Sequence, residues 1–380
     1  MLGYTESTVG ALLGHAAHSV TGQYIHIADE RRVEKVPIVL AIDPHLLDRH
    51  RRFVHLELHR AAVVLLRLAA LLAIALAACA PAASTSPSAS GSVGEPPPSA
   101  VAAPTQLVVG LGYIPSVQFA PFYLADQRGD YSAAGLDVTI QNQIDPDLIS
   151  LVGTGSVDLA LADGTSVIPA VSQGIPIRYI ATIYGTLPNV VIARADAGIA
   201  KPSDLRGKRI GTPGRYGSGY LPLLGIIADA GVNESDLSIE LFPDYGQTQA
   251  LISGKADAAT GFANNDLVQA EAAGLSLSVF YASASAPFAG PGLISSPETI
   301  GAKGDAIRAF VRVTLEAMER ISADPQLGVE AAGAVVPELV ADAAARERAL
   351  AVMEATIEIW RGPVQAARGL GAIDRDGWEV

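Results

Sequence analysis

The sequence predicts an α/β protein in which two parallel-sheet lobes are joined by a hinge and followed by a helical C-terminal tail. Apolar runs typical of buried strands alternate with helical stretches between residues 106 and 184, and the alternation repeats between 189 and 281. From Thr299 onward the chain is nearly all helical. Strands that alternate with helices form parallel sheets with right-handed crossovers. Each repeat therefore predicts one lobe.

Four strands and three helices are expected in the first repeat. Short apolar runs bounded by turn residues mark the strands. We expect strands at 107–112, 137–140, 157–161 and 177–184, and helices at 118–128, 147–152 and 165–173.

The second repeat has the same character. A short helix, a turn and a strand are expected within 201–211. The helix expected at 217–230 should end at Gly231, which serves as its C-terminal cap. Further strands are expected at 189–194, 238–242, 256–262 and 275–281, and helices at 217–230, 247–253 and 266–273.

A short return strand at 292–295 decides how the lobes are joined. If it pairs with the first sheet, the chain crosses between the lobes twice, near 189–194 and 288–295. Two crossings make a hinge. The expected division is then 106–190 with 290–380 as lobe 1 and 191–289 as lobe 2. The tail helices should break at Pro325, Pro337 and Pro363.

The stretch 76–79, Leu-Ala-Ala-Cys, separates a leader from this body. It ends an apolar run, 68–78, that follows Arg60 and Arg67 and is too short to span a bilayer alone. An apolar residue, two small ones and Cys resemble the bacterial lipoprotein signal, in which the Cys is acylated and becomes the new N-terminus. The alternative is an idle or buried cysteine.

On the lipoprotein interpretation, residues 1–78 are removed and Cys79 carries the lipid. Residues 79–105 are rich in Ala, Ser, Pro and Gly, and predict a disordered linker. The expected location is the cell membrane, lipid-anchored on its extracytoplasmic side. No Met lies between Met1 and Met318, and a signal peptide should begin only a few residues before Arg60, so we expect translation to begin at a non-AUG codon near residues 54–58. The alternative is a genuine but disordered N-terminal extension.

Charge argues against nucleic acid as a partner. The chain carries a net charge of −13, and residues 1–79 contain eight Lys and Arg against seven Asp and Glu. The remainder therefore carries −14. An acidic domain repels phosphate backbones.

The histidines argue against catalysis. All seven precede the expected cleavage site, and Cys79 is the only cysteine. The body beyond Cys79 therefore lacks the residues of Ser-His-Asp and Cys-His chemistry and of nearly every zinc site. No suitably spaced carboxylate cluster replaces them. We expect no enzyme activity, no metal and no cofactor. The histidines are His15, His18, His26, His45, His50, His55 and His59.

Ligands of open α/β sheets bind outside the C-terminal ends of the strands, and four strand ends carry suitable side chains. After the first strand, Tyr113 and Phe119 are candidates to stack on a planar ring, although both residues fit a core equally well. At the second of these strand ends, after the strand expected at 157–161, Asp163 is a candidate acceptor for a ring N–H or a hydroxyl. Its alternative role is the N-cap of the next helix.

The third strand end is the glycine-rich turn 211–219, which leads into a helix whose free N–H groups suit anions, carbonyls and hydroxyls. It lacks the Lys-Ser/Thr pair of a P-loop. Within it, Arg215 is a candidate for an acidic group or a solvated loop charge, and Tyr216 is a candidate to stack. Gly217 and Ser218 complete the predicted contacts.

The fourth strand end is 262–266. Asn264 offers a donor and an acceptor to the edge of a heterocycle, and Asp266 offers a carboxylate. The alternative is that Asn265 or Asp266 caps the next helix. Tyr184 and Asn189, near the first crossing, are further candidates.

The order and spacing of several motifs resemble the substrate-binding lipoproteins of ABC importers, in the branch of the sulfonate, nitrate and thiamine-precursor receptors. The resemblance covers about 107–361 and implies the bilobal periplasmic-binding-protein (type II) fold. It also implies a small-molecule ligand and partnership with permease and ATPase subunits. The motifs are APFYLA (120–125), GDY (129–131), GLDV (135–138), GKRIG (207–211), GS (217–218) and GFANND (261–266).

Within that branch, 261–266 and 356–361 look most like receptors for vitamin-type heterocycles, such as riboflavin or thiamine pyrimidine precursors. Those relatives often carry Glu where Asp266 stands, and Asp is one methylene shorter. A nitrate or aliphatic sulfonate receptor is the alternative. A pyrimidine-synthesis enzyme of similar fold is another, but it depends on a histidine and a cysteine-rich motif, and the part of this chain beyond Cys79 has neither.

Overall fold

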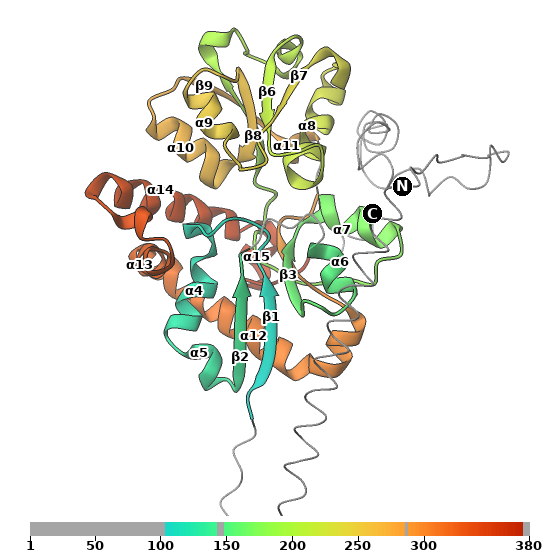
Figure 1. The fold of residues 1–380 in the computed structure, drawn as a ribbon, viewed down its shortest axis with the longest axis vertical. Coiled ribbons are helices and arrows are strands. Elements are labelled where there is room, and N and C mark those ends of the chain that lie inside the picture. Colours follow the sequence, from blue (N-terminus) through green and yellow to red (C-terminus); the bar gives the residue numbers. More distant parts are fainter. Residues whose placement is uncertain (1–102, 143–147, 286–287, 375–380) are drawn as a thin grey trace, which may run out of the picture. The chain divides into compact units, whose positions relative to one another are not determined.

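The structure is a computed structural model that describes residues 103–142, 148–285 and 288–374 (Figure 1). These residues form two five-stranded sheets with helices around them. The expected leader, Cys79 and most of the expected linker lie outside the described residues. In the part of the chain that is described, no helix is long and apolar enough to cross a membrane.

The first sheet has the strand order β2-β1-β3-β10-β4. Four of its strands, β1 to β4, come from the first repeat, and the fifth, β10, is the predicted return strand, which lies between β3 and β4. The return strand does pair with the first sheet, as two crossings require. The strands are β1 Thr105–Gly110, β2 Leu136–Gln141, β3 Leu159–Ala162, β4 Arg178–Thr182 and β10 Gly292–Ser295.

The second sheet has the order β7-β6-β8-β5-β9. Both sheets follow one pattern, because the strand that comes directly from the other sheet takes the fourth place in each. The strands are β5 Asn189–Arg194, β6 Arg209–Thr212, β7 Ser238–Leu241, β8 Ala258–Phe262 and β9 Leu277–Tyr281.

The sheets are mixed, which corrects the expectation of purely parallel ones. Strand β10 runs antiparallel to β3 and β4, and β5 runs antiparallel to β8 and β9. The reason is the route of the chain. A strand entered directly from the other sheet starts at the edge where the parallel strands end, and must run back between them. Accordingly Asn189 lies opposite Phe262, the last residue of β8.

The tail is helical, and its breaks fall at the three expected prolines. Each proline is the first residue of a new helical segment, a position where the missing N–H costs nothing. Helices α12 and α13 contact α4 beside the first sheet (Figure 1).

The α-helices are α4 Ala120–Gln127, α5 Asp130–Ala133, α6 Leu148–Gly153, α7 Gly164–Ser172, α8 Gly217–Asp229, α9 Gln247–Ile252, α10 Val268–Ala272, α11 Ala282–Ser285, α12 Pro297–Ala323, α13 Pro325–Val335, α14 Ala343–Trp360 and α15 Pro363–Arg368. Short 3-10 segments are η2 Val117–Phe119, η3 Ala195–Ala197, η4 Pro202–Leu205, η5 Glu234–Asp236 and η7 Pro337–Val340.

One expected helix, 266–273, begins differently. The chain leaves β8 directly into a five-residue π-helix, η6 Ala263–Leu267, and only then enters α10. Single π-turns are frequent at functional sites. Here the π-turn follows a strand that ends at the candidate site.

The largest core cluster lies between the first sheet and the tail. Tyr131 stacks on Phe310 with ring centroids 5.0 Å apart, and Phe122 stacks on Phe310 at 6.2 Å. Trp360 at the end of α14 is fully buried in the same cluster. A separate cluster, which includes Tyr220 of α8, covers one face of the second sheet.

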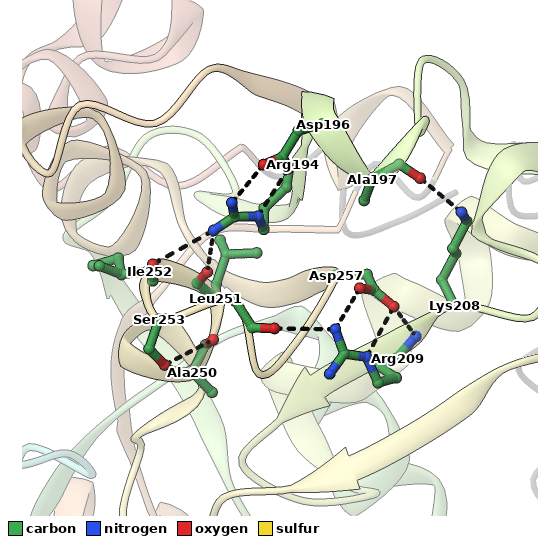
Figure 2. A network of polar contacts seen from close by, with 11 residues as sticks. Arg194, Asp196, Ala197, Lys208, Arg209, Ala250, Leu251, Ile252, Ser253 and Asp257 are labelled. Carbon is green, nitrogen blue, oxygen red and sulfur yellow. Dashed lines mark hydrogen bonds and ion pairs between the residues drawn. The ribbon is translucent and has the colours of Figure 1, made fainter.

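A polar network fixes the end of α9 on the second sheet (Figure 2). Arg194 donates to the carbonyl of Leu251 at 3.1 Å, and Arg209 donates to the carbonyl of Gly254, also at 3.1 Å. Positive side chains at this end complement the helix dipole. Asp257 holds the Arg209 guanidinium in place at 2.7 Å. The network thereby positions α9, whose first residue reaches the candidate site.

Candidate ligand-binding site

A cavity of about 530 Å³ lies at the carboxyl ends of the strands and is lined by residues of both sheets and their helices. This is the place that the strand-end argument predicts. Nine of the eleven predicted site residues line it. They are Tyr113, Phe119, Asp163, Tyr184, Asn189, Tyr216, Gly217, Ser218 and Asp266.

Aromatic rings gather on one part of the lining. Tyr113 meets Phe119 edge to face, with ring centroids 6.4 Å apart, and meets Tyr245 edge to face at 4.6 Å. Phe119 also belongs to the core cluster of the first sheet, and Tyr113 packs against that cluster, so both residues line the cavity and contact the core. Burial raises the pKa of the Tyr113 hydroxyl, and the nearby Asp266 raises it further. Tyr113 therefore presents a neutral phenol.

Tyr245 lines the cavity and was not predicted as a site residue. Its backbone has φ 60°, the left-handed conformation that favours glycine. Such a conformation costs a non-glycine residue roughly 1–2 kcal/mol and is found at functional sites. The composition around it, Pro243-Asp244-Tyr245-Gly246, signals a turn, but a turn signal does not say where the ring points.

Asp163 caps α7 and faces the cavity. One carboxylate oxygen accepts from the Thr165 backbone N–H at 2.9 Å and from its hydroxyl at 2.5 Å. Burial raises the pKa of the carboxyl, and the hydrogen bonds from Thr165 oppose that shift. Asp163 therefore caps the helix and lines the cavity at the same time.

Asp266 lies inside η6 and accepts two hydrogen bonds. Its donors are the Thr248 hydroxyl and, at 2.8 Å, the Phe262 backbone N–H. Burial raises the pKa of this carboxyl as well. The carboxyl can lie here only because residue 261 is glycine. A Cβ on Gly261 would approach the Asp266 Cβ to 2.5 Å.

The glycine-rich turn contributes at the start of α8. Gly217 has φ +56°, and Ser218 follows it in the first turn of the helix. The Ser218 carbonyl accepts from the Asn189 side-chain amide, so the turn is tied to the first residue of β5. The Tyr216 ring lies against Gly214 and is partly exposed at the cavity.

Two predicted residues, Arg215 and Asn264, lie outside the lining, which corrects the sequence-based site. The Arg215 guanidinium donates to the Glu234 carboxylate and, at 3.2 Å, to the Tyr220 hydroxyl. Arg215, the candidate contact for an acidic group of the ligand, is therefore paired with a carboxylate of the protein itself, in the η5 segment that follows α8. Asn264 is fully buried and donates to the Thr356 hydroxyl of α14 at 2.9 Å.

Sequence reasoning missed several polar side chains of the lining. Two of them, Gln247 and Thr260, lie at a predicted helix start and inside a predicted strand, where no local signal separates a site residue from an ordinary one. Asn265 was considered only as a helix cap. The missed polar residues, besides Tyr245, are Gln118, Ser150, Thr165, Ser166, Gln173, Gln247, Thr260 and Asn265.

The charge of the lining is one-sided. None of the lining residues, all within the described part of the chain, is Lys, Arg or His. Two carboxyls, Asp163 and Asp266, are present. The cavity therefore offers aromatic faces, amides and hydroxyls to a ligand, and no counter-charge to an anion.

The comparison with family models agrees with this picture. The model described as NMT1/THI5 like matches residues 116–327, which is more than half of the chain. The match begins just before η2 and ends in α13, so it includes the second sheet, every strand of the first sheet except β1, and most of the residues that line the cavity.

Individual relatives include both binding proteins and enzymes. The riboflavin-binding protein RibY of Chloroflexus aurantiacus is 29% identical over 316 residues, 82% of this chain and 89% of the relative. A formylaminopyrimidine-binding protein of Halalkalibacterium halodurans is 26% identical over 57% of this chain and 66% of its own. A 4-amino-5-hydroxymethyl-2-methylpyrimidine phosphate synthase of Schizosaccharomyces pombe is 30% identical, but over only 37% of this chain and 40% of its own.

Solved structures show the same fold. The alkanesulfonate-binding protein SsuA of Xanthomonas axonopodis pv. citri has a TM-score of 0.53 at 20% identity, and covers 66% of this chain and 85% of its own. A Candida albicans protein described as having the generic periplasmic binding protein structural fold has a TM-score of 0.50 at 19% identity, over 61% of this chain and 76% of its own. The chain has the periplasmic-binding-protein fold and belongs to the NMT1/THI5-like family.

Proposed function

We propose that this chain is the extracytoplasmic solute-binding component of an ABC importer, and that its ligand is an uncharged aromatic vitamin or vitamin precursor. The observation that carries the proposal is the cavity itself, with aromatic rings, buried polar groups and two carboxyls, and with no basic side chain in its lining. The family match and the two binding-protein relatives support a receptor of this kind.

The lining disfavours the nitrate or sulfonate alternative. A permanently charged anion that enters a buried site needs a cation or an array of donors to replace its water. Here the Arg215 guanidinium is engaged by Glu234, and the carboxyls Asp163 and Asp266 would repel an anion unless protonated. The fold shared with SsuA does not carry over its ligand, because the two chains are only 20% identical.

The size of the cavity favours the larger of the two vitamin-type ligands. Cavities of about 300–1,000 Å³ enclose drug-sized ligands. A volume of about 530 Å³ suits a three-ring flavin with its side chain better than a single pyrimidine ring. The relative matched over most of both chains, RibY, is named for riboflavin. Riboflavin is therefore our leading ligand, and a thiamine pyrimidine precursor is the second.

Catalysis is the weaker alternative, although some relatives are named as synthases. The chain beyond Cys79 has no histidine and no cysteine to move protons or attack a substrate. Asp163 and Asp266 are both committed as hydrogen-bond acceptors. The matched part of the Schizosaccharomyces pombe synthase is also less than half of that protein.

The two sheets explain how such a receptor works. In our proposal residues 106–190 and 290–380 form one lobe, 191–289 form the other, and the two crossings at β5 and β10 act as the hinge. A ligand that contacts both lobes stabilises the closed form by the contacts made only there. Permease and ATPase subunits then recognise that form, while lipid on Cys79 holds the receptor at the membrane.

A titration of the purified full-length chain tests the ligand class. Riboflavin should raise the free energy of unfolding by about 2.7 kcal/mol at 100 times its Kd, and stacking should quench flavin fluorescence. Flavin mononucleotide is the matched control, because it adds only a phosphate. It should bind at least tenfold more weakly. A thermal shift with taurine or nitrate, and none with riboflavin or pyrimidine precursors, would overturn the proposal.

A further inference from the structure

Three side chains of the cavity each contain a buried polar atom that has no hydrogen-bond partner among the described residues. The atoms are Asn189 Oδ1, Gln247 Oε1 and Thr260 Oγ1. The residues are only 2%, 3% and 3% exposed. All three belong to the second sheet or to the helix packed on it, and all three line the cavity. We name them the acceptor wall.

The orientation of Asn189 follows from its second hydrogen bond. Its side-chain nitrogen donates to the Ser218 carbonyl, and only the nitrogen of an amide can donate to a carbonyl. The oxygen must therefore be the end without a partner. Thr260 lies on the same face of the sheet, because Asn189 pairs with Phe262 and Val191 pairs with Thr260 across β5 and β8.

Gln247 approaches from the other side of the sheet as the first residue of α9. The helix lies so close to β6 that a Cβ on Gly211 would approach the Gln247 Cβ to 3.1 Å. The other end of α9 is held by Arg194 and Arg209 (Figure 2). The Gln247 carbonyl is thus presented to the cavity by a helix that packs closely on β6 at its start and is held by hydrogen bonds at its end.

Buried polar groups without partners are rare and costly in free energy. Three of them in one cavity therefore indicate which hydrogen-bonding groups a ligand of this cavity carries. Two are amide carbonyl oxygens, which can only accept. The ligand must therefore supply several separate donors. The edge of a ring imide carries one N–H, and would leave one of the carbonyl oxygens unpaired. A polyhydroxylated chain carries O–H groups on several successive carbons, which is enough donors for all three atoms.

We propose that the acceptor wall binds a polyhydroxylated side chain of the ligand and thereby sets specificity for a ring that carries one. The inference rests on the proposed function, and deepens it by assigning the two parts of the ligand. The ring lies with the aromatic side chains at Tyr113 and Phe119, and the hydroxylated chain lies against Asn189, Gln247 and Thr260.

The first test changes the ligand and leaves the protein intact. Riboflavin and lumiflavin share one ring system, but lumiflavin has a methyl group in place of the hydroxylated chain. By fluorescence titration of the full-length chain, lumiflavin should bind at least a hundredfold more weakly than riboflavin. A site built to pair with hydroxyls rejects an analogue without them, because its polar groups stay unpaired. Equal affinities would overturn the inference.

The second test changes the wall. Thr260→Val and Gln247→Met keep size and remove the polar atom, so each should weaken riboflavin about five- to tenfold and change lumiflavin by less than twofold. Thr139→Val on β2 and Gln249→Met on α9 make the same chemical changes at exposed positions, and should leave both affinities unchanged. Thermal melts verify that each variant is folded.

The outcomes separate the two proposals. If the unmodified chain binds neither flavin, the proposed ligand class fails and this inference fails with it. If riboflavin binds but both wall variants affect the two flavins equally, or neither flavin, the ligand class stands and the acceptor wall does not read the hydroxylated chain. Selective loss of riboflavin in either variant supports the inference.

Discussion

Gly261 shows how a single residue without a side chain shapes the site. It lies between Thr260 of the acceptor wall and Phe262, whose N–H binds Asp266. Any Cβ at 261 would meet the Cβ and Cγ of Asp266 at 2.5 and 2.6 Å. These atoms are close to the backbone and cannot swing away. The position of a buried carboxyl therefore depends on the absence of one methyl group.

We predict that Gly261→Ala lowers the free energy of unfolding by about 1–3 kcal/mol, because the added methyl forces η6 or β8 to shift. Riboflavin binding should weaken in parallel. Urea denaturation and fluorescence titration measure the two effects.

Gly301→Ala is the matched control. Gly301 is exposed on α12, and a Cβ there meets no atom within 4 Å. Alanine should therefore raise stability by up to about 1 kcal/mol through helix propensity. Equal stabilities for the two variants would contradict the steric argument.

At the scale of elements, η6 and α14 are tied by one buried hydrogen bond. Asn264 donates to Thr356, and the Thr356 hydroxyl in turn donates to the Val352 carbonyl one turn earlier in α14 at 2.6 Å. The π-helix therefore rests on the tail while its next two residues, Asn265 and Asp266, face the cavity. Asn264 acts as a positioning residue for the site.

We predict that Thr356→Val costs about 1–3 kcal/mol of stability, because the buried Asn264 side-chain nitrogen loses the acceptor to which it donates in α14. It should also weaken riboflavin binding, since η6 loses its support. Denaturation and binding titrations are the measurements.

Thr314→Val provides the comparison. Thr314 is equally buried and bonds Tyr131 and the Phe310 carbonyl, but it has no link to η6. A similar loss of stability with unchanged affinity is expected for it. If both variants weaken binding equally, the tie between η6 and α14 has no special role.

At the scale of the whole molecule, the route of the chain places the site. Because β5 and β10 each enter a sheet from the other one, both crossings lie at the carboxyl ends of the parallel strands. The same edge carries Tyr113, Asp163 and Asp266. The proposed hinge and the proposed binding site are thus consequences of one topological feature.

Membrane attachment is a prediction for the whole chain that the sequence alone supports, because Cys79 lies outside the described residues. We predict that Cys79→Ala moves the receptor from the membrane fraction to the soluble extracytoplasmic fraction, since no acylated residue remains to hold it. Its riboflavin affinity should not change. Cell fractionation and titration are the measurements, and a Ser90→Ala variant in the linker should stay in the membrane fraction. Retention of the Cys79→Ala protein would contradict the anchor.

Local patterns were sufficient for much of the fold. Strand and helix periods are properties of neighbouring residues, and the predicted elements correspond to the observed ones along both repeats. Proline breaks at 325, 337 and 363 are equally local. Nine of the eleven residues predicted mainly from the strand ends line one cavity.

The sequence by itself determined that the chain is an α/β protein with two repeats, a helical tail and chemistry at the strand ends, since these depend on residue type and spacing. Only the tertiary structure decided the direction of β5 and β10. It also decided which residues line the cavity: Tyr245, Gln247 and Thr260 do, whereas Arg215 and Asn264 do not. These outcomes depend on partners that are far away in the chain. Asn264, for example, donates to Thr356, which lies 92 residues later in the sequence. Whether a buried polar atom is satisfied or left for a ligand is a property of the packed molecule, because only packing shows which partners remain.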